Sequence, residues 1–240
     1  MNNLVLELIN KPRLGLEAEN LTPCKLGSMS LDEIKKLKVY EGKWVRELGE
    51  YFSVSGVPGD HITLVGDLSG IQRIGEGMSS GELVIEGNAG IYLGKGMKGG
   101  RITVKGDAAS WTGMEMTGGE ILVEGDAGNY LGSGYRGSGV GMTGGEIRVD
   151  GCAGCNTGAG MCGGLIVVGG DAGEFTGYGM RKGEIRIDGV AGRGLGAEMA
   201  GGEIIACGGV KKMLPSFKKE DGKVFRGDLT VKGGGVIRLR

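Results

Sequence analysis

The chain is poor in the residues on which most catalytic and metal sites depend. It has one histidine, His61, and five cysteines among 240 residues. A histidine-rich metal site is therefore excluded, and any Ser–His–Asp or Cys–His unit would have to use His61. So few cysteines argue against a secreted disulfide scaffold. We interpret His61 as a structural residue at the entry of a strand.

Net charge and long apolar runs are lacking as well. The formal net charge is −1, which gives no electrostatic attraction for nucleic acid or an anionic membrane. No apolar run approaches the roughly 18 residues of a membrane span. Residues 1–20 alternate apolar and charged residues where a signal peptide would be apolar. We expect a cytoplasmic protein with no nucleic-acid partner and no membrane span.

Glycine, in contrast, is abundant, and its 55 residues recur with a period. A glycine precedes each of seven short apolar segments, at steps of 19, 19, 26, 19, 19 and 19 residues. The long step is one ordinary repeat with seven additional residues. A period near 20 is typical of a solenoid, in which each repeat buries its apolar face by stacking on its neighbours. These anchor glycines are Gly81, Gly100, Gly119, Gly145, Gly164, Gly183 and Gly202.

The five residues after each anchor glycine alternate between apolar and polar positions. The second and fourth are apolar, and the flanking residues are mostly charged. A period of two places one face inward and one outward, which predicts a half-buried strand and not a helix. The inward pairs are Leu83/Ile85, Ile102/Val104, Ile121/Val123, Ile147/Val149, Ile166/Val168, Ile185/Ile187 and Ile204/Ala206.

Other positions also keep one residue type through the repeats. A glycine ends each strand, an alanine stands two residues later, and further on a second glycine precedes a methionine by three residues. Such columns indicate repeats that stack in register, with parallel strands about 4.8 Å apart. We expect the methionines to fill the interior. The two columns are Ala89, Ala108, Ala127, Ala153, Ala172 and Ala191, and Met78, Met97, Met116, Met142, Met161, Met180 and Met199.

The repeats predict an all-β fold, a right-handed parallel β-helix of ~19-residue coils. Parallel strands cannot be joined by tight hairpins, and nineteen residues leave no room for a crossover helix, so the chain must coil continuously. Right-handed winding follows from strand twist. A leucine-rich-repeat horseshoe has a similar period, but its leucine and asparagine positions are missing here.

The two ends depart from the repeat and are interpreted as caps that cover open strand edges. We divide the chain into an N-terminal capping segment (1–58), the β-helix (59–209) and a C-terminal cap (210–240). The first segment has a strand-like stretch, Leu4–Ile9, and a predicted helix at 31–38 with a capping box of Ser30 and Glu33. Asp228–Lys232 is predicted to be the final strand.

No motif indicates catalysis by this chain. Gly94, Gly96 and Gly99 match the dinucleotide-binding fingerprint, but a strand follows them where that site needs a helix. No Gly-Lys-Ser/Thr phosphate loop is present. We therefore assign no catalytic, cofactor-binding or metal-binding residue to the chain.

Three cysteines leave an alternative open. Cys152, Cys155 and Cys162 lie in one repeat, and the first two have the spacing of ligands for zinc or an iron–sulfur cluster. A fourth ligand is missing, because Cys207 lies about 14 Å away at the spacing of stacked strands. Ordinary small residues are the preferred interpretation.

Two features predict surfaces for partner proteins. The outward middle position of several strands is apolar, which suggests a covered face. The seven-residue insertion carries an aromatic residue and an arginine, both common interface anchors. The candidate interface residues are Leu122, Leu165, Val167, Ile205, Tyr135 and Arg136.

The repeat pattern Gly-Gly-Glu-Ile-x-Val-x-Gly-Asp-Ala-Gly…Gly-x-x-Met resembles a known glycine-rich family. It is shared by the C-terminal domain of the glutamate synthase large subunit and by the third (C) subunit of formylmethanofuran dehydrogenase, with a relative in the formyltransferase/hydrolase complex. Three features favour the formylmethanofuran dehydrogenase group: a chain that is nearly all repeat, the stretch 32–54 before the repeats, and the insertion Tyr135–Ser138 before Gly141–Gly145. The resemblance covers about residues 30–209, and the cysteine-rich repeat departs from the pattern.

This resemblance implies a structural subunit without cofactors in a cytoplasmic complex of methanogenic archaea, a complex that reduces CO2 and condenses it with methanofuran. Tungsten or molybdenum pterin, iron–sulfur clusters and a binuclear metal site would belong to sibling subunits. The implied partners are a formate-dehydrogenase-like subunit, an amidohydrolase-like subunit and ferredoxin-type subunits. Alternatives are the scaffold of a formyltransferase/hydrolase complex and a stand-alone module of the glutamate synthase type.

Overall fold

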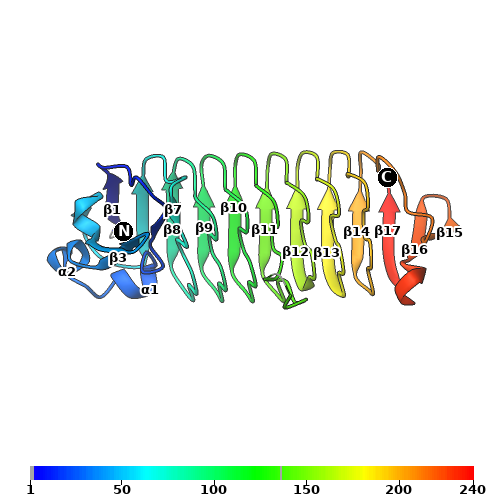
Figure 1. Cartoon of the computed structure of the whole chain (residues 1–240), viewed down its shortest axis with the longest axis horizontal. Helices are drawn as coiled ribbons and strands as arrows, with labels where there is room; N and C mark the ends of the chain where they lie inside the picture. The colour runs from blue at the N-terminus through cyan, green and yellow to red at the C-terminus, as the bar shows by residue number, and fades with distance from the viewer. Residues whose placement is uncertain (1–2, 136) are drawn as a thin grey trace.

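The chain is nearly all β, as predicted. The computed structural model describes residues 3–135 and 137–240. Within these residues, thirteen strands form one mixed sheet in the order β15-β16-β17-β14-β13-β12-β11-β10-β9-β8-β6-β1-β5. A second sheet has the order β4-β3-β2-β7. The strands of the large sheet stand side by side along the long axis of the molecule (Figure 1).

Parallel strands one repeat apart make up the centre of the large sheet. They pair in register, so that Ile121 lies between Ile102 and Ile147. The long step keeps this register, and its additional residues therefore lie outside the strands. The strands are β6 (His61–Val65), β8 (Glu82–Glu86), β9 (Arg101–Val104), β10 (Glu120–Val123), β11 (Glu146–Val149), β12 (Cys162–Val168), β13 (Lys182–Ile187) and β14 (Glu203–Ala206).

The predicted inward residues form the core. On β9, Ile102 and Val104 are buried while Thr103 between them is partly exposed. All seven methionines of the predicted column are fully buried. The alanine column forms a second ladder of parallel bridges, which runs from Leu68 to Val210. Each repeat is thus joined to the next through its strand and through its alanine.

Glycine is required where the chain turns inward after the alanine. Gly94 has φ +62, and a Cβ added there would lie 2.6 Å from the Cδ1 atom of Ile121 in the repeat after next. The left-handed backbone and the close approach both favour glycine. Gly94 and Gly96 lead to β9 and not to a helix, which agrees with the rejection of a dinucleotide site.

A row of side-chain acceptors, here called the corner ladder, stabilises the turn after each strand. The side chain of each member accepts the backbone N–H of the equivalent residue one repeat later: Asp107 Oδ1 accepts from Asp126 at 2.8 Å, and Asp126 Oδ1 accepts from Cys152 at 2.7 Å. Cys152 replaces the carboxylate with sulfur, which accepts from Asp171 at 3.4 Å. The members are Asn88, Asp107, Asp126, Cys152 and Asp171.

The N-terminal segment adds strands to both sheets. β1 (Asn3–Leu8), close to the predicted 4–9, pairs in parallel with β6 and antiparallel with β5. The capping box of Ser30 and Glu33 is present, but its helix α2 ends at Lys35, earlier than predicted, because β3 starts at Lys38. The other elements are β2 (Leu16–Glu17), α1 (Pro23–Leu26), β3 (Lys38–Glu41), β4 (Trp44–Glu47), η1 (Leu48–Glu50), β5 (Phe52–Gly56) and β7 (Ile71–Gln72).

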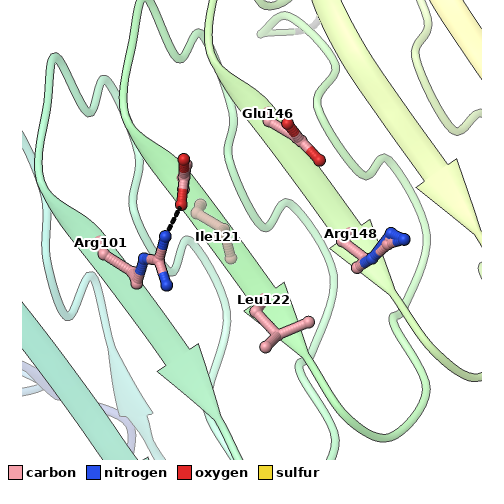
Figure 2. A pocket seen from close by; sticks show the side chains of 6 residues that line it. Arg101, Ile121, Leu122, Glu146 and Arg148 are labelled. Atoms are coloured by element: carbon pink, nitrogen blue, oxygen red, sulfur yellow. Dashed lines mark ion pairs between the residues drawn. The ribbon is translucent and has the colours of Figure 1, made fainter.

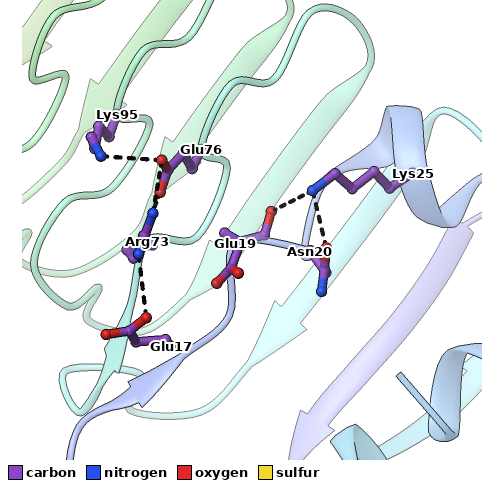
Figure 3. A network of polar contacts seen from close by, with 7 residues as sticks. All are labelled: Glu17, Glu19, Asn20, Lys25, Arg73, Glu76 and Lys95. Carbon is purple, nitrogen blue, oxygen red and sulfur yellow. Dashed lines mark hydrogen bonds and ion pairs between the residues drawn. The ribbon is translucent and has the colours of Figure 1, made fainter. Parts of the chain in front are cut away.

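Arg73 connects the N-terminal segment to the stack (Figure 3). Its guanidinium lies 3.2 Å from Glu17 on β2 and 2.5 Å from Glu76, and Lys95 of the next repeat lies 3.2 Å from Glu76. Burial alone would raise the pKa of Glu76, but hydrogen bonds from Arg73 and Lys95 outweigh burial and lower this pKa. The charged form of Glu76 is therefore the one that the fold stabilises.

The C-terminal segment corrects one prediction. Asp228–Lys232 is not the final strand: Leu229–Val231 form the 3-10 helix η2, because the Asp228 carboxylate accepts the Thr230 N–H at 2.9 Å and holds the chain in a turn. The final strand is β17 (Gly235–Leu239), which continues the stack in parallel with β14. A hairpin of β15 (Lys218–Asp221) and β16 (Val224–Gly227) pairs antiparallel with β17.

Candidate interaction surfaces

The predicted apolar column lies on the outward face of the large sheet, but arginines interrupt it. The register places Arg148 between Leu122 and Val167, and Arg186 between Val167 and Ile205. Ile205 is already buried within the chain, with 8% of its surface exposed. The column therefore offers separate apolar positions flanked by charge, and not one continuous apolar stripe.

A shallow pocket of about 180 Å³ surrounds Leu122. Figure 2 shows Leu122 on the middle strand, with Arg101 and Arg148 on the strands to either side. Arg101 forms an ion pair of 2.5 Å with Glu120. Within the described residues, Glu146 and Arg148 form no ion pair, so two charges beside Leu122 are available to a partner.

Leu165 lies in the neighbouring outward column, on the same strand as Val167. Its register partners are Glu146 and Glu184, and Glu184 forms an ion pair with Arg186. Leu165 and Val167 are both partly exposed. The structure thus brings Leu165 and Val167 together, with carboxylates and arginines around them.

The insertion lies away from this sheet face, on the connections between strands. Tyr135 is 61% exposed, and its N–H donates to Glu115 at 3.2 Å. The Ser138 N–H donates to the Tyr135 carbonyl at 3.0 Å, which closes a turn before Met142 resumes the repeat. The predicted interface residue Arg136 lies outside the described residues. Tyr135 and the sheet residues therefore belong to two separate surfaces.

An aromatic column stands next to the insertion, and sequence reasoning missed it. Trp111 and Tyr130 stack face to face, with ring centroids 4.1 Å apart and an interplanar angle of 5°. Tyr92 is tilted against Trp111 at 6.1 Å. The signal in the sequence is the 19-residue spacing of these rings, but Arg73, Asn156 and Gly194 of the same column are not aromatic. The column consists of Arg73, Tyr92, Trp111, Tyr130, Asn156, Phe175 and Gly194.

This column has a backbone that side chains rarely adopt. φ is +63 at Tyr92, +68 at Trp111 and +58 at Phe175, whereas glycine takes the same place at Gly194 with φ +72. A bulky residue in the left-handed region costs on the order of 1 kcal/mol or more. Ring stacking offsets part of this cost for Trp111, but Phe175 is 44% exposed. Aromatic residues therefore occupy positions in this column where the backbone favours glycine or asparagine.

A lateral groove of about 550 Å³ opens between these rings and Tyr178. Gly134, Gly160 and Gly179 lie along it and leave the backbone uncovered by side chains. The Tyr178 hydroxyl donates to Glu198 at 2.8 Å, and this hydrogen bond raises the pKa of Tyr178. The groove lining, called the aromatic groove below, includes Trp111, Tyr130, Tyr135, Asn156, Tyr178 and Arg181.

A third exposed apolar surface lies on the hairpin of β3 and β4. Tyr40, Trp44 and Val45 are 45%, 54% and 56% exposed. Tyr40 and Val45 are opposite each other in the hairpin. The sequence contains this apolar cluster, but only the pairing of β3 with β4 shows that it faces outward.

The residues considered for chemistry do not assemble into a site. His61 lies at the start of β6, with its Nδ1 atom 3.0 Å from a Glu82 carboxylate oxygen. Cys152 takes part in the corner ladder, and the thiol of Cys162 donates to the Gly160 carbonyl at 3.3 Å. Within the described residues, no group of three or more His, Cys, Asp or Glu side chains could hold a metal ion. The same residues contain no helix long and apolar enough to cross a membrane.

The strands that stack one repeat after another define a class of elongated repeat proteins, in which each repeat contacts mainly its neighbours. No family model matches the chain. One curated relative is the C subunit of tungsten-containing formylmethanofuran dehydrogenase 2 from Methanothermobacter wolfeii, 43% identical over 98 residues. Another is the C subunit of molybdenum-containing formylmethanofuran dehydrogenase 1 from Methanosarcina barkeri, 46% identical over 83 residues.

These matches cover 39% and 32% of this chain, and 36% and 28% of the relatives, so the chain spans about a third of the length of the curated relatives it matches. A solved structure is similar over nearly the whole chain. It is a chain of the formyltransferase/hydrolase complex from Methylorubrum extorquens with methylofuran, at TM-score 0.88, 27% identity and 98% coverage of both chains. The resemblance predicted from the repeats is confirmed by these comparisons.

Proposed function

We propose that the chain is a non-catalytic structural subunit of a formylmethanofuran dehydrogenase. The observation that carries the proposal is the identity of 41–46% to the C subunits of such enzymes. The relatives named as tungsten or molybdenum enzymes are subunits of larger assemblies. The extended stack of repeats fits the part of a scaffold in such an assembly.

We further propose that the repeating region, 59–209, is a right-handed parallel β-helix, with 1–58 and 210–240 as its caps. The parallel pairing at each repeat supports continuous coiling, and the right-handed twist of strands favours that hand. The antiparallel strands β5 and β15 at the two ends support the capping role. A rigid rod of this kind would hold larger subunits at a constant separation.

The proposed partners are a formate-dehydrogenase-like subunit that carries tungsten or molybdenum pterin, an amidohydrolase-like subunit and ferredoxin-type subunits, all in the cytoplasm. Iron–sulfur clusters and a binuclear metal site would belong to these partners. The proposed contact residues are Leu122, Leu165 and Val167 on the sheet face, Ile205 at its end, and Tyr135 and Arg136 in the insertion. Arg148 and Glu146 beside Leu122 support a contact that combines apolar and charged groups.

A second candidate is the scaffold of a formyltransferase/hydrolase complex. It is favoured by the structural similarity, which extends over 98% of both chains. This assembly would use the same surfaces without a tungsten or molybdenum partner.

Affinity purification of the tagged chain from its own cells, with mass spectrometry and metal analysis of the eluate, distinguishes the candidates. Tungsten or molybdenum together with iron and an amidohydrolase-like partner would support the first. A formyltransferase and a hydrolase without either metal would support the second. A chain that elutes alone under gentle conditions would contradict both.

A further inference from the structure

Two glycine amides in the aromatic groove already form hydrogen bonds within the chain. The Gly160 N–H donates to the Tyr178 carbonyl at 2.7 Å, and the Gly179 N–H donates to the Ala197 carbonyl at 2.8 Å. Both amides are used in contacts between repeats. These two amides are therefore not available to a peptide that would bind as an added strand.

Side-chain donors are available on the walls. Within the described residues, the Trp111 indole N–H, the Tyr135 hydroxyl and the Asn156 amide form no hydrogen bond to the chain. All three residues line the groove. Their donors suit a ligand that presents backbone carbonyls without partners of its own.

The groove is long enough for a short polyproline II segment. Trp111 and Tyr178 stand three repeats apart, which is about 14 Å at the spacing of stacked strands. A polyproline II segment of about five residues covers this length at ~3.1 Å per residue. Such segments have no internal hydrogen bonds, and their proline rings pack on aromatic side chains.

We propose that the aromatic groove binds a proline-containing polyproline II segment of a partner protein, an inference that rests on the proposed role as a subunit of a complex. Trp111 and Tyr130, two of the four aromatic residues that line the groove, carry their rings on a left-handed backbone that glycine or asparagine would adopt with less strain. Two charged residues line the groove: Glu198, which accepts the Tyr178 hydroxyl, and Arg181, which forms no ion pair within the described residues. An acidic residue of the ligand would therefore be bound beside Arg181 and not beside Glu198.

The full-length chain can be tested directly with a peptide probe. The chain has two tryptophans, Trp44 and Trp111, and the substitution W44F leaves Trp111 as the only indole reporter. We expect acetyl-decaproline-amide to change the Trp111 fluorescence with a dissociation constant below about 1 mM. A glycine–serine decapeptide of the same length serves as the control and should give no saturable change.

Three variants in the W44F background sharpen the test. Tyr178→Ala and Tyr135→Ala should weaken decaproline binding at least about fivefold, as expected for an aromatic anchor. Tyr40→Ala removes a similarly exposed tyrosine on β3, far along the chain from the groove, and should change the affinity less than about twofold. Circular dichroism of each variant reports whether the fold is retained.

A saturable response to the glycine–serine peptide, equal binding by Tyr178→Ala, or no response to decaproline would each overturn the inference. None of these results bears on the purification experiment. The chain could still elute with its partner subunits. In that case the scaffold proposal stands, and the proposal that the groove binds a polyproline II segment is wrong. A chain that binds decaproline but elutes alone would contradict the scaffold proposal instead.

Discussion

Cys152 occupies a place in the corner ladder that other repeats fill with a carboxylate or an amide. Its sulfur accepts the Asp171 N–H at 3.4 Å, whereas Asn88 accepts the Asp107 N–H at 2.9 Å. Sulfur is a weak acceptor, so this rung contributes less than its neighbours. The ladder therefore has one weak point in the middle of the stack.

The substitution Cys152→Asn should strengthen this rung. The amide oxygen can accept the Asp171 N–H as Asn88 accepts from Asp107, without adding a charge beside Asp126 and Asp171. We expect the free energy of unfolding to rise by about 0.5–1 kcal/mol, the net value of a neutral hydrogen bond. Urea denaturation followed by circular dichroism measures the change.

Cys207→Ser is the matched control, because Cys207 is a partly exposed free thiol outside the ladder. It should alter the stability by less than about 0.5 kcal/mol. A loss of stability in Cys152→Asn would show that the ladder geometry requires sulfur at this rung.

At the scale of elements, the two edges of the large sheet differ from its centre. β15 forms one edge, and its residues Lys218, Lys219, Glu220 and Asp221 are all exposed and charged. Charged side chains on an edge strand discourage pairing with another sheet. The antiparallel hairpin of β15 and β16 thus ends the parallel stack in a form that does not continue it.

The insertion is an element that the other repeats lack. It follows Gly134 and ends before Met142, where other repeats pass directly from the equivalent residue to the methionine, as in Gly96-Met97. Deleting residues 135–141 restores the 19-residue step. We expect the deleted chain to stay folded but to recover less of its partners, because Tyr135 is lost from the aromatic groove.

Circular dichroism and thermal unfolding would report the fold, and the yield of co-purified partners would report assembly. Tyr135→Ser keeps the loop and separates the contribution of the ring from that of the backbone. Assembly at full yield by the deleted chain would show that the insertion is not an interface.

At the scale of the whole molecule, lowered carboxyl pKa values are concentrated in the N-terminal segment and the first repeat, and in the C-terminal segment. Hydrogen bonds from Lys11 and Ser69 lower the pKa of Asp67 to about 2. Arg73 and Lys95 lower that of Glu76 against the effect of burial. Burial would also raise the pKa of Asp228, but hydrogen bonds from Thr230 and Glu198 lower it. The same direction holds for Glu33, Glu41, Glu47 and Glu220.

Acid should therefore loosen the ends before the centre. A carboxyl group whose pKa is lowered by folding stabilises the fold above its ordinary value, 4.5 for Glu and 3.8 for Asp, and this contribution is lost as the pH falls through the lowered pKa. Between about pH 5 and pH 2, we expect amide protection to decrease first in residues 1–76 and 210–240.

Hydrogen exchange at pH 7 and pH 3, corrected for the intrinsic rate, measures this difference. Glu76→Gln should lower the stability at pH 7 and make the N-terminal segment less sensitive to pH. A uniform loss of protection along the chain would contradict the prediction, since it would mean that the ends and the central repeats unfold as one unit.

Much of the fold follows from the sequence by itself. The alternation in segments such as Ile102–Val104 determines which side of each strand faces inward, because the side-chain period of a strand is two. The constant spacing of glycine, alanine and methionine determines the register of the stack, since a column of one residue type fits only if repeats lie directly above each other. The burial of the methionines follows from the same register.

Only the tertiary structure decides which of two possible segments becomes the final strand, and which residues far apart in the chain lie together. Asp228–Lys232 has the composition of a strand, but the Asp228 carboxylate binds the Thr230 N–H, and β17 takes the place beside β14. The aromatic groove depends on Trp111, Tyr135 and Tyr178, which are far apart in the chain and belong to different positions of the repeat. These residues come together because the repeats stack in three dimensions, and a local sequence pattern does not predict such contacts.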